Sequence, residues 1–266
     1  MTALVDEDNA LVKRLSRERS DSNTELLAMD LMKLMEDKFH MRPFLVKTHA
    51  HRKFIDVNRR VNGSKACCPR IAYKCLATAS YDHGPGEAPN LDRARKVNMA
   101  RAIYDEYHRA IYKTINRIHR TMPGQPIYLL DVHAQRARTN RQLGITAREM
   151  FDTVIVGTRD GELVRSREAL YAPGGLLHHL AHNGGLRLFP PSAQVRDHPR
   201  YNGGHIVAEF GYNQVRGVEV NAVQLEFGIN LRMRPNGRSD AVQAFADALH
   251  ALAVAAAANA APASEA

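Results

Sequence analysis

Apolar residues recur every three or four positions in three parts of the chain, and this spacing predicts amphipathic helices. Asp21, Ser22 or Asn23 can cap the first helix, Pro123 ends the second, and Ser239 can cap the third. The three helices are expected over residues 22–39, over residues 92–121 and after residue 239. Their apolar faces would consist, in turn, of Leu27, Leu31, Leu34 and Met35; of Ile103, Tyr107, Ile111, Ile115 and Ile118; and of Val242, Phe245, Leu249 and Leu252.

Short apolar runs between these helices predict strands. They are PIYLLDVH (126–133), FDTVIVGT (151–158), LRLFP (186–190), GGHIVAEFG (203–211) and NAVQLEFG (221–228), and PFLVKTHAHRKFIDVNR (43–59) would add one or two more. Because strands alternate with helices, we expect an α/β fold with a mixed or largely parallel central sheet. We expect a polar arm over residues 1–20, one domain over 21–255 and a flexible Ala-rich tail over 256–266.

Two of these strands carry polar residues that suggest chemistry. In LLDVHA, Asp131 and His133 are two positions apart and would share one face of a strand. A histidine at that place is either a metal ligand or a capped side chain in a polar loop. In NAVQLEFG, Gln224 and Glu226 share a face, and Glu226 is either a general base for hydrolysis or a solvated carboxylate on an edge strand.

The segment HRKFIDVNR alternates charged and apolar residues, as a strand would. Arg52, Asp56 and Asn58 would lie on one face, with Arg59 on the other. Two guanidinium groups near an amide and an Asp suit a clamp for a carboxylate. The alternative is an edge strand whose charges face water.

Composition narrows the range of partners. A formal net charge of +9 attracts anions of many kinds, but the Arg residues are scattered and aromatic residues make up only 6% of the chain. We therefore do not expect a nucleic-acid partner. No apolar run in the sequence is expected to be long enough to span a membrane. No secretory signal is visible and three cysteines fit a reducing compartment, so we expect a cytoplasmic protein.

Taken in order, five motifs resemble those of the N-formylglutamate amidohydrolase family. They are HRKFIDVNR (51–59), LLDVHA (129–134), FDTVIVGTRDG (151–161), YNGGHIVAEFG (201–211) and VNAVQLEFGINLR (220–232). The resemblance implies a fold like that of zinc carboxypeptidases, a three-layer α/β/α sandwich around a mixed, largely parallel sheet. It also implies a zinc-dependent hydrolase that cleaves the amide bond of a small acidic N-formyl or N-acyl amino acid, such as N-formylglutamate.

The family's functional residues can be carried over by motif. His133 would bind zinc, and Asp21, an acidic residue just before the first helix, would be a second zinc ligand. Glu226 would be the general base. The residues that would hold the substrate are Arg52, Asn58 and Arg59, with Asp56 orienting its neighbours.

The chain departs from the family at one point. The family's His-Ser-Gly or His-Gly-Gly turn, which supplies a zinc-binding His, has no counterpart before Asp21. His49 and His51 are possible replacements. A catalytic zinc commonly has three protein ligands. The alternative function is therefore a catalytically impaired family member that binds an anionic ligand or a protein.

Overall fold

The computed structural model describes residues 23–50, 55–60, 91–135 and 145–260. By its internal contacts the chain forms two compact units. Unit 1 consists of residues 1–20 and 46–115, and unit 2 consists of residues 21–45 and 116–266. The two units are described separately below.

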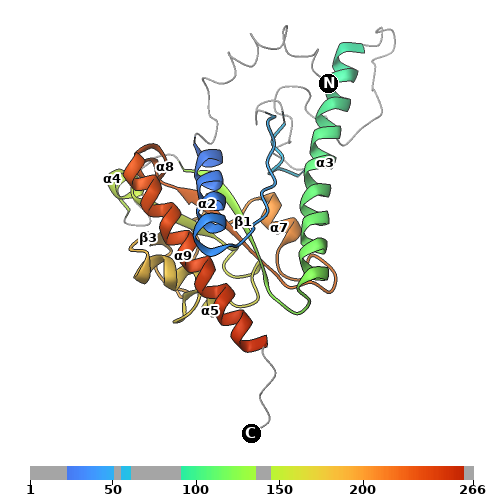
Figure 1. Ribbon diagram of the computed structural model, residues 1–266. Helices are drawn as coiled ribbons and strands as arrows, with labels where there is room; N and C mark the ends of the chain where they lie inside the picture. The colour runs from blue at the N-terminus through green and yellow to red at the C-terminus, as the bar shows by residue number, and fades with distance from the viewer. Residues whose placement is uncertain (1–22, 51–54, 61–90, 136–144, 261–266) are drawn as a thin grey trace. The chain divides into compact units, whose positions relative to one another are not determined.

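Unit 2 contains a mixed four-stranded sheet (Figure 1). Its strands, in spatial order, are β1 (Ile127–Ala134), β4 (Val220–Phe227), β2 (Thr153–Gly157) and β3 (Arg187–Phe189). β1 is parallel to β4 and β2 is parallel to β3, whereas β2 and β4 are antiparallel. All four coincide with apolar runs that predicted strands, so the expected α/β fold with a mixed, largely parallel sheet is confirmed.

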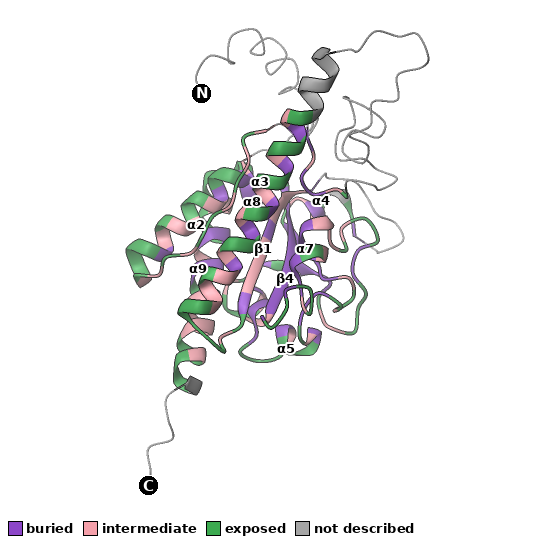
Figure 2. Ribbon diagram, turned by 90° about the vertical axis from the view of Figure 1, so that its right-hand side faces the viewer, coloured by how far each residue is buried: buried purple, intermediate pink, exposed green. Residues whose placement is uncertain are grey.

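One face of this sheet is apolar and packs against helices. Alternate residues of β4, including Val223, Leu225 and Phe227, join a buried cluster with Leu27 of α2 (Thr24–Phe39) and Phe245 of α9 (Pro235–Ala260). Each such side chain contributes on the order of 1.5–3 kcal/mol when fully buried. Strand β4 is buried along its whole length, which Figure 2 shows as a continuous purple strand.

The other face of the sheet is covered by a short helix, α7 (His205–Phe210), which contacts β1 and β4. Helices therefore lie on both faces, and the expected three layers are present. The remaining short helices are α4 (Ala147–Met150), α5 (Arg167–Tyr171), α6 (Leu176–His178), the π-helical turn η2 (His179–Asn183) and α8 (Ile229–Met233).

The prediction of a strand at GGHIVAEFG is wrong, because this segment forms α7. Ile206, Val207 and Phe210 are all buried, and their spacing gives one apolar face on a helix. His205 and Glu209, four residues apart, form an ion pair that a helix brings together. The short apolar run fits either the helical repeat of 3.6 residues or the strand repeat of two residues. Its tertiary contacts with the sheet decide in favour of the helix.

The ends of two predicted helices also differ from expectation. α9 begins at Pro235 and not at Ser239, since proline is well tolerated in the first turn of a helix. It continues to Ala260, inside the segment where we expected a tail. Asn23 stands at the start of α2 in a left-handed conformation (φ 62°) without a side-chain capping bond. Its amide instead lies 3.4 Å from the carbonyl oxygen of Arg232.

Among the described residues, α9 is the helix that is long and apolar enough to cross a bilayer, judged by length and composition alone. The expectation that no apolar run has this length is therefore wrong. Ala241, Phe245 and Ala248 of α9 are buried in the core of unit 2, and α9 packs against α2 and α8. Of its most apolar stretch, 33% is buried.

Unit 1 is built on the long helix α3 (Leu91–Thr121), whose last residues belong to unit 2. The helix was predicted correctly, although its buried side is rotated from the predicted face. Ile111 and Ile115 are buried as expected, and they are joined by Tyr104 and His108. With Ala100, which is also buried, these residues recur at i, i+4, i+8, i+11 and i+15, the repeat of one helical face.

The predicted strand over residues 43–59 is not present in the described part of that segment. Asp56–Arg59 form a turn in which the backbone N–H of Arg59 donates to the carbonyl of Asp56 at 3.2 Å. The N–H of Asn58 donates to Asp56 Oδ1 at 3.1 Å. An Asp that bonds the backbone two residues on favours a turn over a strand, and this chemistry outweighs the alternating pattern.

Candidate functional site

Four polar side chains lie on one face of the paired strands β1 and β4. They are Asp131, His133, Gln224 and Glu226. In the parallel register Asp131 is opposite Gln224 and His133 is opposite Glu226. Paired residues share a face, and so do residues two apart along a strand. His133 and Glu226 each stand one residue before the end of their strand, which puts both at the carboxyl edge of the sheet.

On β1 the two polar residues contact each other. Asp131 Oδ1 lies 3.0 Å from His133 Nε2, and both side chains are largely buried. An imidazole that donates from Nε2 and is neutral carries its lone pair on Nδ1. A carboxylate that fixes the tautomer of a histidine in this way is a common partner of a metal-binding imidazole. The pair therefore fits the metal role that the sequence suggested for His133.

A second pair lies beside it on β4. Gln224 Nε2 donates to Glu226 Oε1 at 2.7 Å, and both residues are 6% exposed. β4 lies inside the sheet between β1 and β2, so the alternative of a solvated Glu226 on an edge strand is wrong. Among the described residues no group donates to the buried Gln224 Oε1. A buried acceptor that receives no hydrogen bond from the described residues suggests a functional site.

The neighbouring strand β2 leaves room for backbone on the same face. Gly157 is opposite Gln224, and a Cβ at Gly157 would lie 2.6 Å from the backbone nitrogen of Gly203. The backbone N–H of Arg159 donates to the carbonyl of Asn202 at 2.6 Å. The segments GTRDG and YNGGH therefore contact each other here. Their glycines have no side chain, so the two backbones can approach closely.

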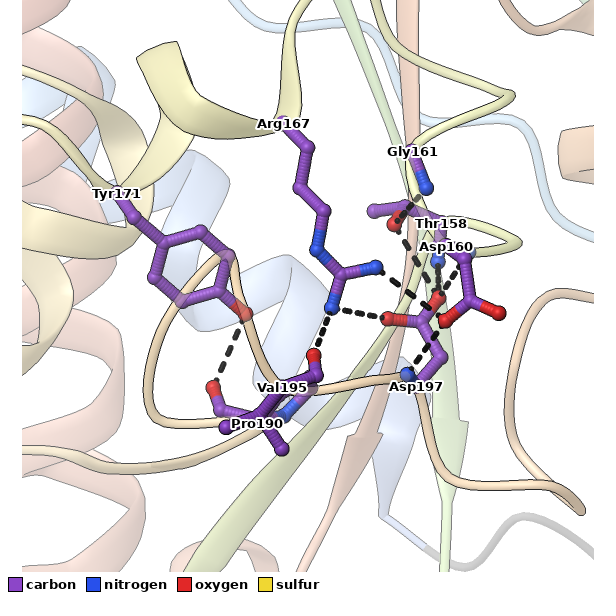
Figure 3. Close-up of polar contacts among 8 residues, drawn as sticks. All are labelled: Thr158, Asp160, Gly161, Arg167, Tyr171, Pro190, Val195 and Asp197. Atoms are coloured by element: carbon purple, nitrogen blue, oxygen red, sulfur yellow. Dashed lines mark hydrogen bonds and ion pairs between the residues drawn. The ribbon is translucent and has the colours of Figure 1, made fainter.

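A buried ion pair fixes the loop that follows β2 (Figure 3). Asp197 Oδ2 accepts from the backbone N–H groups of Thr158 (2.6 Å) and Asp160 (3.0 Å), and Asp197 Oδ1 pairs with Arg167 Nη2 at 2.9 Å. Arg167 also donates to the carbonyl of Val195. Nothing in the local pattern of GTRDG points to a partner so distant in sequence as Asp197.

Tyr171 belongs to the same region, and its hydroxyl donates to the carbonyl of Pro190 at 3.0 Å (Figure 3). Burial raises the pKa of Tyr171 well above its usual value. The hydroxyl therefore stays protonated and remains a donor at neutral pH.

His198 lies beside the apolar part of the same sheet face. Phe189 is opposite Ile155 in the β2–β3 register, and Ile155 is opposite Glu226 in the β2–β4 register. The rings of His198 and Phe189 meet edge to face, with their centroids 6.2 Å apart. His198 Nδ1 accepts from the backbone N–H of Arg200 at 3.1 Å. Burial lowers the pKa of His198, so the neutral imidazole is favoured.

Helix α7 adds an imidazole and a carboxylate that sequence reasoning missed. His205 Nε2 lies 2.9 Å from Glu209 Oε2, and both are ligand types that a divalent metal accepts. They were overlooked because the segment was read as a strand. The signal that could have found them is the i, i+4 spacing of His and Glu, which is that of a helical pair.

The other predicted site residues belong to unit 1 or lie outside the described residues. Asp21 and Arg52, and also His51, are among the residues that the structure does not describe. Asn58 is buried within unit 1, and Arg59 Nε lies 3.6 Å from Asp56 Oδ2. Asn58 and Arg59 therefore occupy a turn and not the strand on which their clamp was based.

Comparison with known proteins gives one match. A family model described as N-formylglutamate amidohydrolase matches residues 3–233. No curated protein and no solved structure matches the chain. The family match spans most of the chain and includes the polar pairs of β1 and β4. The chain therefore belongs to the N-formylglutamate amidohydrolase family.

Proposed function

We propose that this protein is a zinc-dependent hydrolase that cleaves the amide bond of a small N-formyl or N-acyl amino acid. The observation that carries the proposal is the placement of His133 opposite Glu226 at the carboxyl edge of the sheet. Ligands of open α/β sheets bind at that edge. The family supports an amide as the bond attacked.

His133 would hold the metal, and Asp131 would keep its ring in the required tautomer and orientation. Asp21 remains the proposed second ligand. When bound, zinc would act as a Lewis acid toward the amide carbonyl and toward water. Among the residues described, the imidazole and carboxylate of α7 are further donors of a suitable chemical type on this side of the sheet.

Glu226 would act as the general base. It would accept a proton from water as the water oxygen attacks the acyl carbon, and it would return that proton to the leaving nitrogen. The C–N bond breaks, and the products are a carboxylic acid and a free amine. Gln224 holds one oxygen of Glu226, so the carboxylate keeps one orientation throughout the reaction.

Asn58, Arg59 and Arg52 are proposed to bind the carboxylate of the substrate. A guanidinium group pairs with a carboxylate through two parallel hydrogen bonds. Arg59 contacts Asp56 at a distance longer than a good hydrogen bond, and its side chain is 41% exposed, so it can exchange this partner for a substrate.

The test is release of free amine from N-formyl-L-glutamate, with N-acetyl-L-glutamate and N-formyl-L-leucine as comparisons for the acyl group and the side chain. We expect Glu226→Gln to reduce turnover by at least 10²-fold, the lower end of a general base's contribution. Glu219→Gln is the matched control, since Glu219 precedes the same strand and pairs with Arg165. Turnover at the wild-type rate in Glu226→Gln would remove Glu226 from the mechanism.

The second candidate is a family member that binds an anionic ligand or a protein without turnover. The pairing of Arg59 with Asp56 in a turn favours it. Metal analysis separates the two candidates. Near-stoichiometric zinc that is lost on His133→Ala supports the enzyme, whereas a wild-type protein that takes up no zinc supports the binder.

A further inference from the structure

The π-helical turn η2 follows α6. The sequence HHLAH, which spans the junction between the two elements, contains three histidines. π-helical turns are rare and are frequent at functional sites. This one is held firmly in place, because Leu180 is fully buried in the core. At its end a Cβ on Gly184 would lie 2.5 Å from Ala244 Cβ of α9, so the turn rests directly on that helix.

The turn places two of the three imidazole rings against each other. The ring centroids of His178 and His182 are 4.4 Å apart, and the ring planes are tilted by 33°. The third histidine is engaged differently, since Asn183 Nδ2 lies 2.8 Å from His179 Nδ1. His182 is exposed and His178 is half-buried, so the pair of rings is accessible from solvent.

We propose that His178 and His182 form a chelating site for a borderline divalent transition-metal ion, namely Zn²⁺, Ni²⁺ or Cu²⁺. Imidazole nitrogens suit these ions, whereas Mg²⁺ and Ca²⁺ prefer oxygen. An ion bound by both rings needs one nitrogen of each within about 2.0–2.1 Å, and ring centroids 4.4 Å apart keep the two side chains close enough for one ion to reach both. The backbone of the π-helical turn thus fixes the ligand pair before the ion arrives.

The surroundings of the pair fit a cation. His178 and His182 line a cavity of about 320 Å³ together with Glu168, Ser192 and Gln194. The Glu168 carboxylate contributes negative charge, and the hydroxyl and amide groups offer oxygen ligands. With two protein nitrogens the ion keeps open positions, which water or a small anionic ligand can fill.

This site is separate from the proposed catalytic centre. Leu176, Leu177 and Leu180 belong to the apolar cluster that covers the core face of the sheet, whereas His133 lies on the other face. The inference therefore does not depend on the proposed function, and each can fail without the other.

The experiment is titration of chelator-treated protein with Cu²⁺ and Ni²⁺, followed by calorimetry and by the nitrogen hyperfine pattern of bound Cu²⁺. It is carried out in the wild type and in His133→Ala, which removes the other proposed imidazole ligand. His182→Asn is the test variant, and His179→Asn is the matched control on the same turn. We expect His182→Asn to weaken one equivalent of binding at least tenfold and to lose the two-nitrogen signature, with His179→Asn unchanged.

Thermal unfolding provides a second readout. An ion that binds the folded state alone raises the melting temperature, so added Ni²⁺ should stabilise His179→Asn but not His182→Asn. If His133→Ala does not fold, the same differences between the two variants in the otherwise wild-type chain decide the question. Equal affinity in His182→Asn and His179→Asn would overturn the proposal, as would equal stabilisation by Mg²⁺.

Discussion

His133 on β1 lies directly opposite Glu226 on β4, although 92 residues separate them in the chain. Each is held by a polar residue two positions earlier on its own strand, His133 by Asp131 and Glu226 by Gln224. The two strands thus contribute matched pairs, an outer residue at the carboxyl edge and an inner residue that orients it. This arrangement leads to the first two predictions.

The first concerns Asp131. Asp131→Asn should weaken zinc binding by about 10–100-fold, because the imidazole of His133 loses the carboxylate that orients it. The measurement is competition with a chelator of known affinity. Asp30→Asn, which breaks an exposed pair with Arg238, should leave zinc affinity unchanged. An Asp131→Asn protein with wild-type zinc affinity would show that the Asp131–His133 contact is structural.

The second concerns Gln224. Gln224→Met keeps the size of the side chain and removes the donor to Glu226, so we expect kcat to fall about 10–100-fold, the equivalent of one hydrogen bond to a charged group. KM should change little. Gln214→Met, at an exposed position, is the control. In the double variant with Glu226→Gln the losses should not add, since Gln224 acts through Glu226. Fully additive losses would contradict this role.

The third concerns the buried ion pair. Asp197→Ala removes the nearer carboxylate from buried Arg167, whose contact with Asp160 is longer at 3.5 Å, and we expect the free energy of unfolding to fall by about 3–5 kcal/mol. Glu219→Ala breaks the more exposed pair with Arg165 and should cost about 0–1 kcal/mol. Urea unfolding measures both. A loss in Asp197→Ala as small as that in Glu219→Ala would mean that the network of Figure 3 does not stabilise the fold.

The fourth concerns pH. Burial lowers the pKa of His198 in the folded state below its ordinary value of about 6.5. As the pH falls through about 6.5 the unfolded chain binds a proton that folded His198 does not, so stability is lost. Above that pH the residue is neutral in both states and the contribution is constant. His198→Gln should therefore reduce the loss of unfolding free energy between pH 7.5 and 5.5.

The control for this prediction is His182→Gln, at an exposed histidine. It should keep the wild-type dependence on pH in the same urea titrations. If His198→Gln and the wild type lose the same stability over this range, another group is responsible for the acid sensitivity.

The strands β1, β2 and β4 could be predicted because long apolar runs have few other ways to be buried. The face shared by Asp131 and His133 followed from the two-residue repeat of a strand. The partnership of His133 with Glu226 needed the resemblance to the family, because strand order is not visible in the pattern. The helix at residues 205–210 was missed, since Ile206, Val207 and Phe210 suit either period. Asp197 and Arg167 gave no signal, because their partners are set by tertiary packing.

From Val223 to Phe227, strand β4 alternates between the hydrophobic core and the candidate site, and every residue of the strand is buried. A slip of one position against β1 would turn Phe227 toward the polar side chains of the candidate site and would bury the Glu226 carboxylate in the hydrophobic core. A shift in the register of β4 therefore removes both Gln224 and Glu226 from the candidate site. For this protein, chemistry at residue 226 and correct assembly of the central strand are gained or lost as a single event.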